Sequence, residues 1–183
     1  MNSEGTGDTL LPTAQFRAWV GAHPVGGPAL IGLIAVQIAT IIGYFLRGIG
    51  LPQVPWPLFN GVLFAPGAGD FAHYGQEGSF FVGQSIHMVD GVLFAILFAI
   101  AFQSRLGKVN AIAKGIIYSM ILALISAGFL VPYVYVPRQG YGLFSFYGPD
   151  SWKLPVSIAL FPLAYGFMLG FLYQPDDSRE SSV

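Results

Sequence analysis

His87 and Asp90 are the residues of this chain most able to do chemistry, because they stand three positions apart inside an otherwise apolar run. An ionised carboxylate at membrane depth is costly unless it is neutralised, paired or hydrated. Gln84 lies three residues before His87, so helical spacing places these side chains on one stripe. We expect this stripe to face the interior of a helix bundle or a partner protein rather than lipid.

Three roles are open for this pair. His87 and Asp90 could hydrogen-bond to each other and fix helix packing. They could relay protons or ions, a common use of ionisable residues inside membrane spans. Alternatively, His87 could ligate a metal or haem while Asp90 orients the imidazole ring. The candidate cofactor-binding residues are therefore Gln84, His87 and Asp90.

A second polar group just before the apolar run supports the metal hypothesis. Asp70, His73 and Glu77 recur at spacings of three and four residues, and with His87 and Asp90 they form the candidate metal site. Imidazoles with carboxylates suit copper, iron or zinc, so copper, iron or haem is the cofactor considered. The alternative for these loop residues is a solvated surface. Asp70, His73 and His87 are similar to the Asp and two His of the metal-binding subunit of particulate methane and ammonia monooxygenases, although their spacing differs.

Composition places the chain among integral membrane proteins. Of its 183 residues, 54% are hydrophobic and 9% are charged, whereas soluble proteins have about 25% charged residues. Eight basic and nine acidic residues leave no polybasic stripe for nucleic acid. The absence of cysteine excludes disulfides, thiolate metal sites and cysteine nucleophiles. No nucleophile elbow, phosphate loop, zincin helix or dinucleotide fingerprint is present, so catalysis by this chain alone has little support.

The elements that must position the polar residues are four apolar segments, each long enough to cross a bilayer. They cover about 29–46, 81–102, 115–133 and 154–173. The sequence thus predicts an all-α integral membrane fold, a bundle of four transmembrane helices in a single domain over 1–183. The short turn after the second span predicts an antiparallel hairpin with the third. Gly166 and Gly170, four residues apart, predict close helix contact in the last span.

The segments outside the spans have their own patterns. In the N-terminal segment 1–28, Phe16, Trp19 and Val20 fall on one helical face ahead of a Pro- and Gly-rich break, which predicts a short interfacial helix. Residues 174–183 form a polar tail. The long connections 47–80 and 134–153 lie on one side and are rich in proline and aromatic residues, which suits a headgroup-level belt or a docking surface for another subunit. A short strand over 133–136 is also possible.

The distribution of basic residues predicts the orientation. The side with both termini carries five of them, Arg17, Arg105, Lys108, Lys114 and Arg179, and the other side carries Arg47, Arg138 and Lys153. The positive-inside rule therefore favours both termini in the cytoplasm, for a multi-pass protein of a bacterial inner membrane.

Glycine and histidine spacing also carries a resemblance. The second span opens with Gly83, His87 and Gly91, and the last span contains Tyr165, Gly166 and Gly170. In these features the chain resembles a diffuse group of small four-helix bacterial inner-membrane proteins of unknown function. The resemblance implies a compact bundle with a role for His87 and brings no activity with it.

The sequence favours a non-catalytic, polytopic accessory subunit of a larger membrane complex, of respiratory, photosynthetic or oxygenase type. Its partners would then be lipids and other membrane subunits, and its link to electron transport would be indirect. One alternative is a small homo-oligomeric proton or ion transporter or channel that uses His87 and Asp90. The other is a metal- or haem-binding redox subunit.

Overall fold

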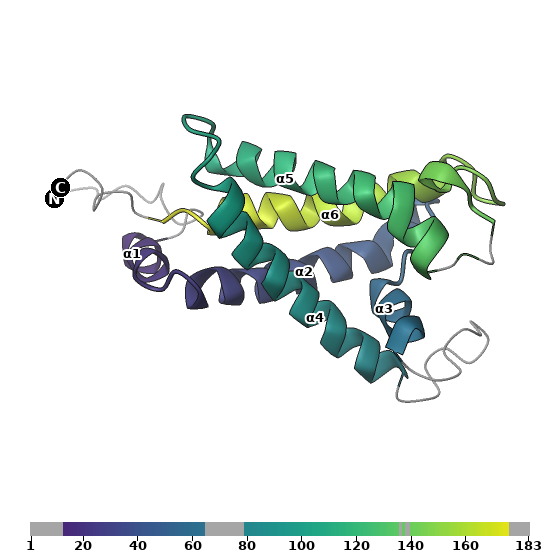
Figure 1. Ribbon diagram of the computed structural model, residues 1–183, viewed down its shortest axis with the longest axis horizontal. Coiled ribbons are helices and arrows are strands. Elements are labelled where there is room, and N and C mark those ends of the chain that lie inside the picture. Colours follow the sequence, from purple (N-terminus) through teal and green to yellow (C-terminus); the bar gives the residue numbers. More distant parts are fainter. Residues whose placement is uncertain (1–12, 65–78, 136, 138–139, 176–183) are drawn as a thin grey trace, which may run out of the picture.

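A computed structural model describes residues 13–64, 79–135, 137 and 140–175 of the chain. The regular secondary structure of the described part is all helical, with no strand (Figure 1). Residues 133–135 continue a helix, so the short strand considered for 133–136 is absent over these positions. In chain order the helices are α1 (Ala14–Ala22), α2 (Gly26–Phe45), η1 (Leu46–Ile49), α3 (Trp56–Phe64), α4 (Ser79–Leu97), η3 (Phe98–Phe102), α5 (Ala111–Ile125), η4 (Ser126–Tyr135), η6 (Leu143–Ser145) and α6 (Lys153–Leu172).

Four of these helical segments are long and apolar enough to cross a membrane, as the sequence predicts. They are Gly26–Ile49, Phe80–Phe102, Ala111–Tyr135 and Lys153–Leu172, which suggests a multi-pass membrane protein. The first begins earlier than expected because Pro28 lies in the first turn of α2, where a helix tolerates proline. The third also begins earlier, because the Asn110 side chain accepts a hydrogen bond from the Ala113 amide at 2.8 Å and caps α5.

The predicted short N-terminal helix is present as α1. The Thr13 hydroxyl caps it by accepting a hydrogen bond from the Phe16 amide at 3.2 Å. Val20 is 1% exposed and packs into the bundle, and Arg17 Nε donates to the Gln174 carbonyl at 3.1 Å. Part of the apolar face of α1 therefore contacts protein. The hydrogen bond from Arg17 also joins α1 to the residues that directly follow α6 (Figure 1).

Glycine pairs decide which helices approach each other. A Cβ on Gly115 of α5 would overlap the carbonyl oxygen of Gly166 of α6, and a Cβ on Gly170 would overlap Ala111. The predicted packing role of Gly166 and Gly170 is confirmed. Gly32 of α2 faces α4 in the same way, because an added Cβ would overlap the Gly91 carbonyl. Gly83 of α4 allows α3 to approach in the same way, so the close pairs are α5 with α6, α3 with α4 and α2 with α4.

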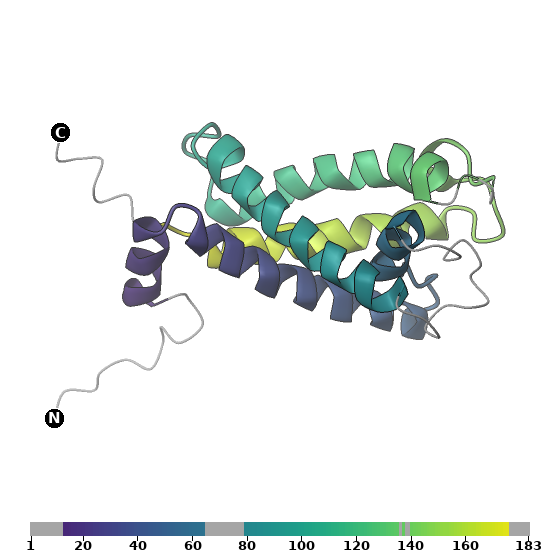
Figure 2. The same ribbon diagram turned by 60° about the horizontal axis from the view of Figure 1, so that its bottom comes forward.

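The expected hairpin of the second and third spans is joined by a short turn, but its arms separate. α4 packs chiefly on α2 and α3, whereas α5 packs chiefly on α6. Figures 1 and 2 show α4 running obliquely away from α5 beyond the turn. The reason is that each arm meets its glycine-matched partner on another helix, so the turn alone does not hold the arms together.

Part of the connection between the first two spans folds back onto the bundle as α3. Trp56 and Phe59 are 7% and 5% exposed. The Trp56 ring centroid lies 5.5 Å from that of Phe161, and the Phe59 ring stacks on Tyr135 at 5.5 Å. For these aromatics the expected headgroup belt or docking surface is wrong, because their contacts lie within the chain. Trp152, in the second connection, remains 56% exposed.

Candidate binding cavity

His87 and Asp90 line one cavity of about 330 Å³ inside the bundle. Its walls come from α3, α4, the α5–η4 segment and α6, with a single residue of α2. Cavities of this size that are mostly apolar and hold a few polar groups are the usual form of small-molecule sites. The other lining residues are Val36, Trp56, Asn60, Gly91, Phe94, Leu122, Ile125, Ser126, Leu130, Tyr135, Phe161, Pro162 and Tyr165.

The position of His87 is fixed by Thr40 on α2. His87 is 4% exposed, and its Nε2 lies 2.9 Å from the Thr40 hydroxyl oxygen. The Thr40 hydroxyl donates its one hydrogen to the Val36 carbonyl at 2.7 Å. It can therefore only accept from His87, so Nε2 carries a proton. In the neutral ring this leaves Nδ1 as the acceptor nitrogen.

Asp90 is held by a chain of hydrogen bonds that crosses three segments. Its Oδ2 accepts from Asn60 Nδ2 at 2.8 Å, and Asn60 Oδ1 accepts from the Tyr135 hydroxyl at 2.8 Å. The structure thus gives His87 and Asp90 different partners and does not join them to each other. A single hydrogen bond from an amide N–H uses only part of the acceptor capacity of a carboxylate, so Asp90 can accept further hydrogen bonds.

Trp56 adds an unpaired donor to the cavity wall. It is 7% exposed, and its indole Nε1–H has no hydrogen-bond partner among the described residues. A buried donor without a partner costs roughly 1–3 kcal/mol. A bound molecule with an acceptor could satisfy this donor.

The cavity has a rim on the outer surface of the bundle. Phe94 of α4 and Ile125 of α5 both line it and are 37% and 47% exposed. They belong to the two helices that separate beyond the connecting turn (Figure 2). Side chains that would face lipid in a membrane are therefore also part of the cavity wall.

The other candidate residues lie elsewhere. Gln84 is absent from the cavity lining, and its Nε2 donates to Gln37 Oε1 of α2 at 3.5 Å. Asp70, His73 and Glu77 fall in 65–78, outside the described residues. Within the part of the chain that the structure describes, no group of three or more His, Asp or Glu side chains is placed to hold a metal ion.

The sequence pattern did not reveal Thr40 and Asn60 as the partners of His87 and Asp90, nor Trp56 and Tyr135 as residues of the same cavity. Asn60 carried the clearest signal, because it is the single amide in the apolar run Trp56–Phe64. Among the other polar residues of the spans, Ser126 and Tyr165 line the cavity, and the Tyr165 hydroxyl donates to the Gly91 carbonyl. The side chains of Tyr118, Ser119 and Ser157 instead donate to main-chain carbonyls elsewhere.

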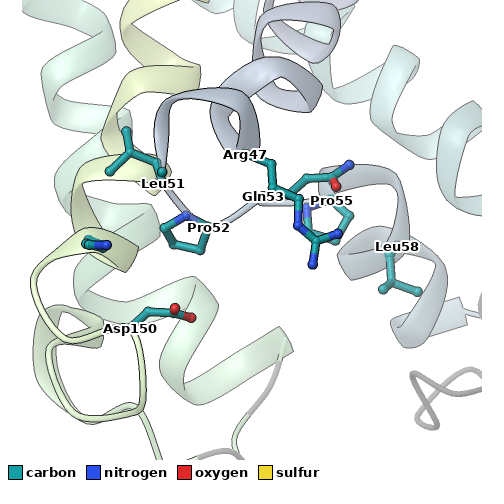
Figure 3. Close-up of a pocket in the computed structure, with 9 residues that line it drawn as sticks. Arg47, Leu51, Pro52, Gln53, Pro55, Leu58 and Asp150 are labelled. Carbon is teal, nitrogen blue, oxygen red and sulfur yellow. The ribbon is translucent and has the colours of Figure 1, made fainter.

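A second, larger cleft of about 770 Å³ lies at the end of the bundle where η1 leads into α3. Its charged residues are Arg47, Asp150 and Lys153, and Figure 3 shows Arg47 and Asp150 on separate segments around it. Charged side chains at the end of a span suit the aqueous boundary. The cavity that lies among the candidate membrane spans is thus the smaller one, around His87 and Asp90.

The chain matches no family model, and comparisons with curated proteins and with solved structures give no match. Its function must therefore be argued from the cavity itself.

Proposed function

We propose that this protein is a non-catalytic membrane protein that takes up a small, mainly apolar molecule from the bilayer into the cavity between α4 and α5. The observation that carries the proposal is the combination of an apolar wall with a few fixed polar groups, of which His87 and Asp90 are the most distinctive. Apolar walls supply affinity, and a small number of placed polar groups orient the bound molecule.

The route of entry supports uptake from lipid rather than from water. Phe94 and Ile125 form part of the wall and are exposed on the surface that the spans would turn to lipid. The charged cleft around Arg47 lies at the end of the bundle, and no described residue lines both this cleft and the cavity. An apolar molecule dissolved in the bilayer would therefore meet the opening directly.

Trp56 provides the readout for a binding experiment. The chain has three tryptophans, and replacing Trp19 and Trp152 by Phe leaves Trp56, which lines the cavity. We expect brominated neopentylbenzene, a small uncharged aromatic, to quench Trp56 fluorescence saturably in protein reconstituted into vesicles, because bromine quenches indole on contact. Ser126→Leu should weaken this binding by about tenfold or more, because it fills the cavity.

Ser85→Leu is the matched control. Ser85 lies on α4, is exposed and does not line the cavity, so its replacement should leave quenching unchanged. Non-saturable quenching, or equal binding by Ser126→Leu and Ser85→Leu, would count against an intramembrane binding site.

A second candidate function is the polytopic subunit of a larger membrane complex. The observation in its favour is a group of exposed aromatic residues in the connection between η4 and α6. Phe146, Tyr147 and Trp152 are 51%, 67% and 56% exposed. A neighbouring subunit would cover such a group, and uptake of a ligand by this chain is compatible with membership of a complex.

A further inference from the structure

We infer that the molecule bound in this cavity is a lipophilic cation whose ammonium-type group lies beside Asp90. The inference rests on the proposed uptake into the cavity and adds the charge of the occupant. It follows from the charge balance of the wall, from its aromatic rings and from the acceptor capacity that Asp90 keeps.

The charge balance of the wall is one-sided. Among the described residues of the lining, Asp90 is the one acidic residue, and none is Lys or Arg. The titratable groups of the described lining are His87, Asp90, Tyr135 and Tyr165. Asp90 is half-buried, and a carboxylate in such a place is unfavourable without an opposite charge. The attraction of a cation placed beside it offsets part of the desolvation cost of both groups. An anionic occupant would instead meet the carboxylate, with no Lys or Arg among the described lining residues to neutralise it.

Aromatic rings surround the same space. Trp56, Phe94, Tyr135, Phe161 and Tyr165 all line the cavity. Ring faces attract ammonium groups electrostatically, and the attraction is stronger where water is excluded, as in aromatic cages for quaternary ammonium ligands. The rings therefore favour a cation that carries its own apolar groups over a small hydrated ion.

Asp90 is able to serve as the counter-ion without breaking its own contact. Within the part of the chain that the structure describes, only Oδ2 is engaged, by the hydrogen bond from Asn60 Nδ2 at 2.8 Å. Asn60 in turn is held by the Tyr135 hydroxyl. The carboxylate is therefore fixed in direction while its remaining lone pairs stay available to the cavity.

The test compares two probes of nearly equal shape in the Trp56-only protein reconstituted into vesicles of zwitterionic lipid. One is brominated benzyltrimethylammonium, whose charge does not titrate, and the other is brominated neopentylbenzene, its uncharged carbon isostere. After correction for partitioning of each probe into protein-free vesicles, we expect the cation to bind at least about tenfold more tightly than the neutral probe.

Asp90→Asn is the decisive variant, because an amide oxygen at this position can still accept from Asn60 Nδ2. It should abolish the preference for the cation and leave binding of the neutral probe intact, which also shows that the cavity is still formed. Asp90→Glu, which restores the charge, should recover part of the preference.

The outcomes separate the two proposals. Equal binding of both probes by the unmodified protein would overturn the inference about charge and leave the proposed uptake standing. A preference for the cation that persists in Asp90→Asn would overturn the role of Asp90. Failure of both probes to bind would remove the proposed function itself.

Discussion

The direction of the hydrogen bonds at Thr40 determines which ring nitrogen of His87 carries the proton. Because the Thr40 hydroxyl donates to Val36, it offers His87 only an acceptor. The imidazole is thereby held against α2, with its ring centroid 5.3 Å from that of Phe161. The side chain that the sequence marks as reactive is thus positioned by a threonine whose role no local pattern reveals.

Thr40→Val tests this arrangement. The valine keeps the shape of the side chain but leaves the His87 Nε2–H without an acceptor in a buried position. We expect a loss of about 1–3 kcal/mol in the free energy of unfolding, the usual cost of an unsatisfied buried donor. Denaturation in detergent micelles measures it. Thr40→Ser, which keeps the hydroxyl, is the control, and equal stability of the two variants would refute the proposed bond.

Contact between α3 and α4 is the element-level feature on which the cavity depends. A Cβ on Gly83 of α4 would overlap the Pro57 carbonyl oxygen and lie 2.7 Å from the Gly61 amide nitrogen. Gly83 therefore allows the backbone of α3 to lie directly on α4. This contact brings Asn60 within hydrogen-bonding distance of Asp90.

Gly83→Ala should push α3 away from α4. We expect a loss of roughly 1–3 kcal/mol in stability, the common cost of overpacking a close contact, together with weaker quenching of Trp56 by the neutral probe. Gly48→Ala is the control, because a Cβ on Gly48 meets nothing within 4 Å. If the two variants have the same stability and the same probe affinity, the α3–α4 contact does not hold the cavity.

At the scale of the whole molecule, two ends of one bundle differ in character. The end with α1 is closed by internal bonds such as that from Arg17 to Gln174. The other end holds the charged cleft and the exposed rings of Phe146 and Trp152. The second candidate function would place the contact with another subunit at this second end.

Extraction in mild detergent tests this second candidate function. If a partner covers the aromatic end, the protein should migrate as a complex larger than its own 19.7 kDa, and Phe146→Ser with Trp152→Ser should release the partner. Ile100→Ser is the control, because Ile100 is 67% exposed but lies in η3, close to the α4–α5 turn. A monodisperse monomer with no co-purifying chain contradicts the subunit role.

The sequence by itself determined the four apolar helices, the short helix ahead of them and the interior placement of His87. These features follow from local rules, because a bilayer demands about 20 apolar residues per span and a buried polar group must avoid lipid. The close contacts of Gly166 and Gly170 also follow from their spacing, since small residues allow helices to approach.

Only the tertiary structure decided the partners of the polar residues and the return of α3 to the bundle. Thr40 and His87 are 47 positions apart in the chain, Asn60 and Asp90 are 30 apart, and Asn60 and Tyr135 are 75 apart. Helical periodicity reports which face a residue occupies and not which distant residue meets it. The hydrogen-bond network around Asp90, and with it the cavity, therefore depends on how α2, α3, α4 and η4 pack together.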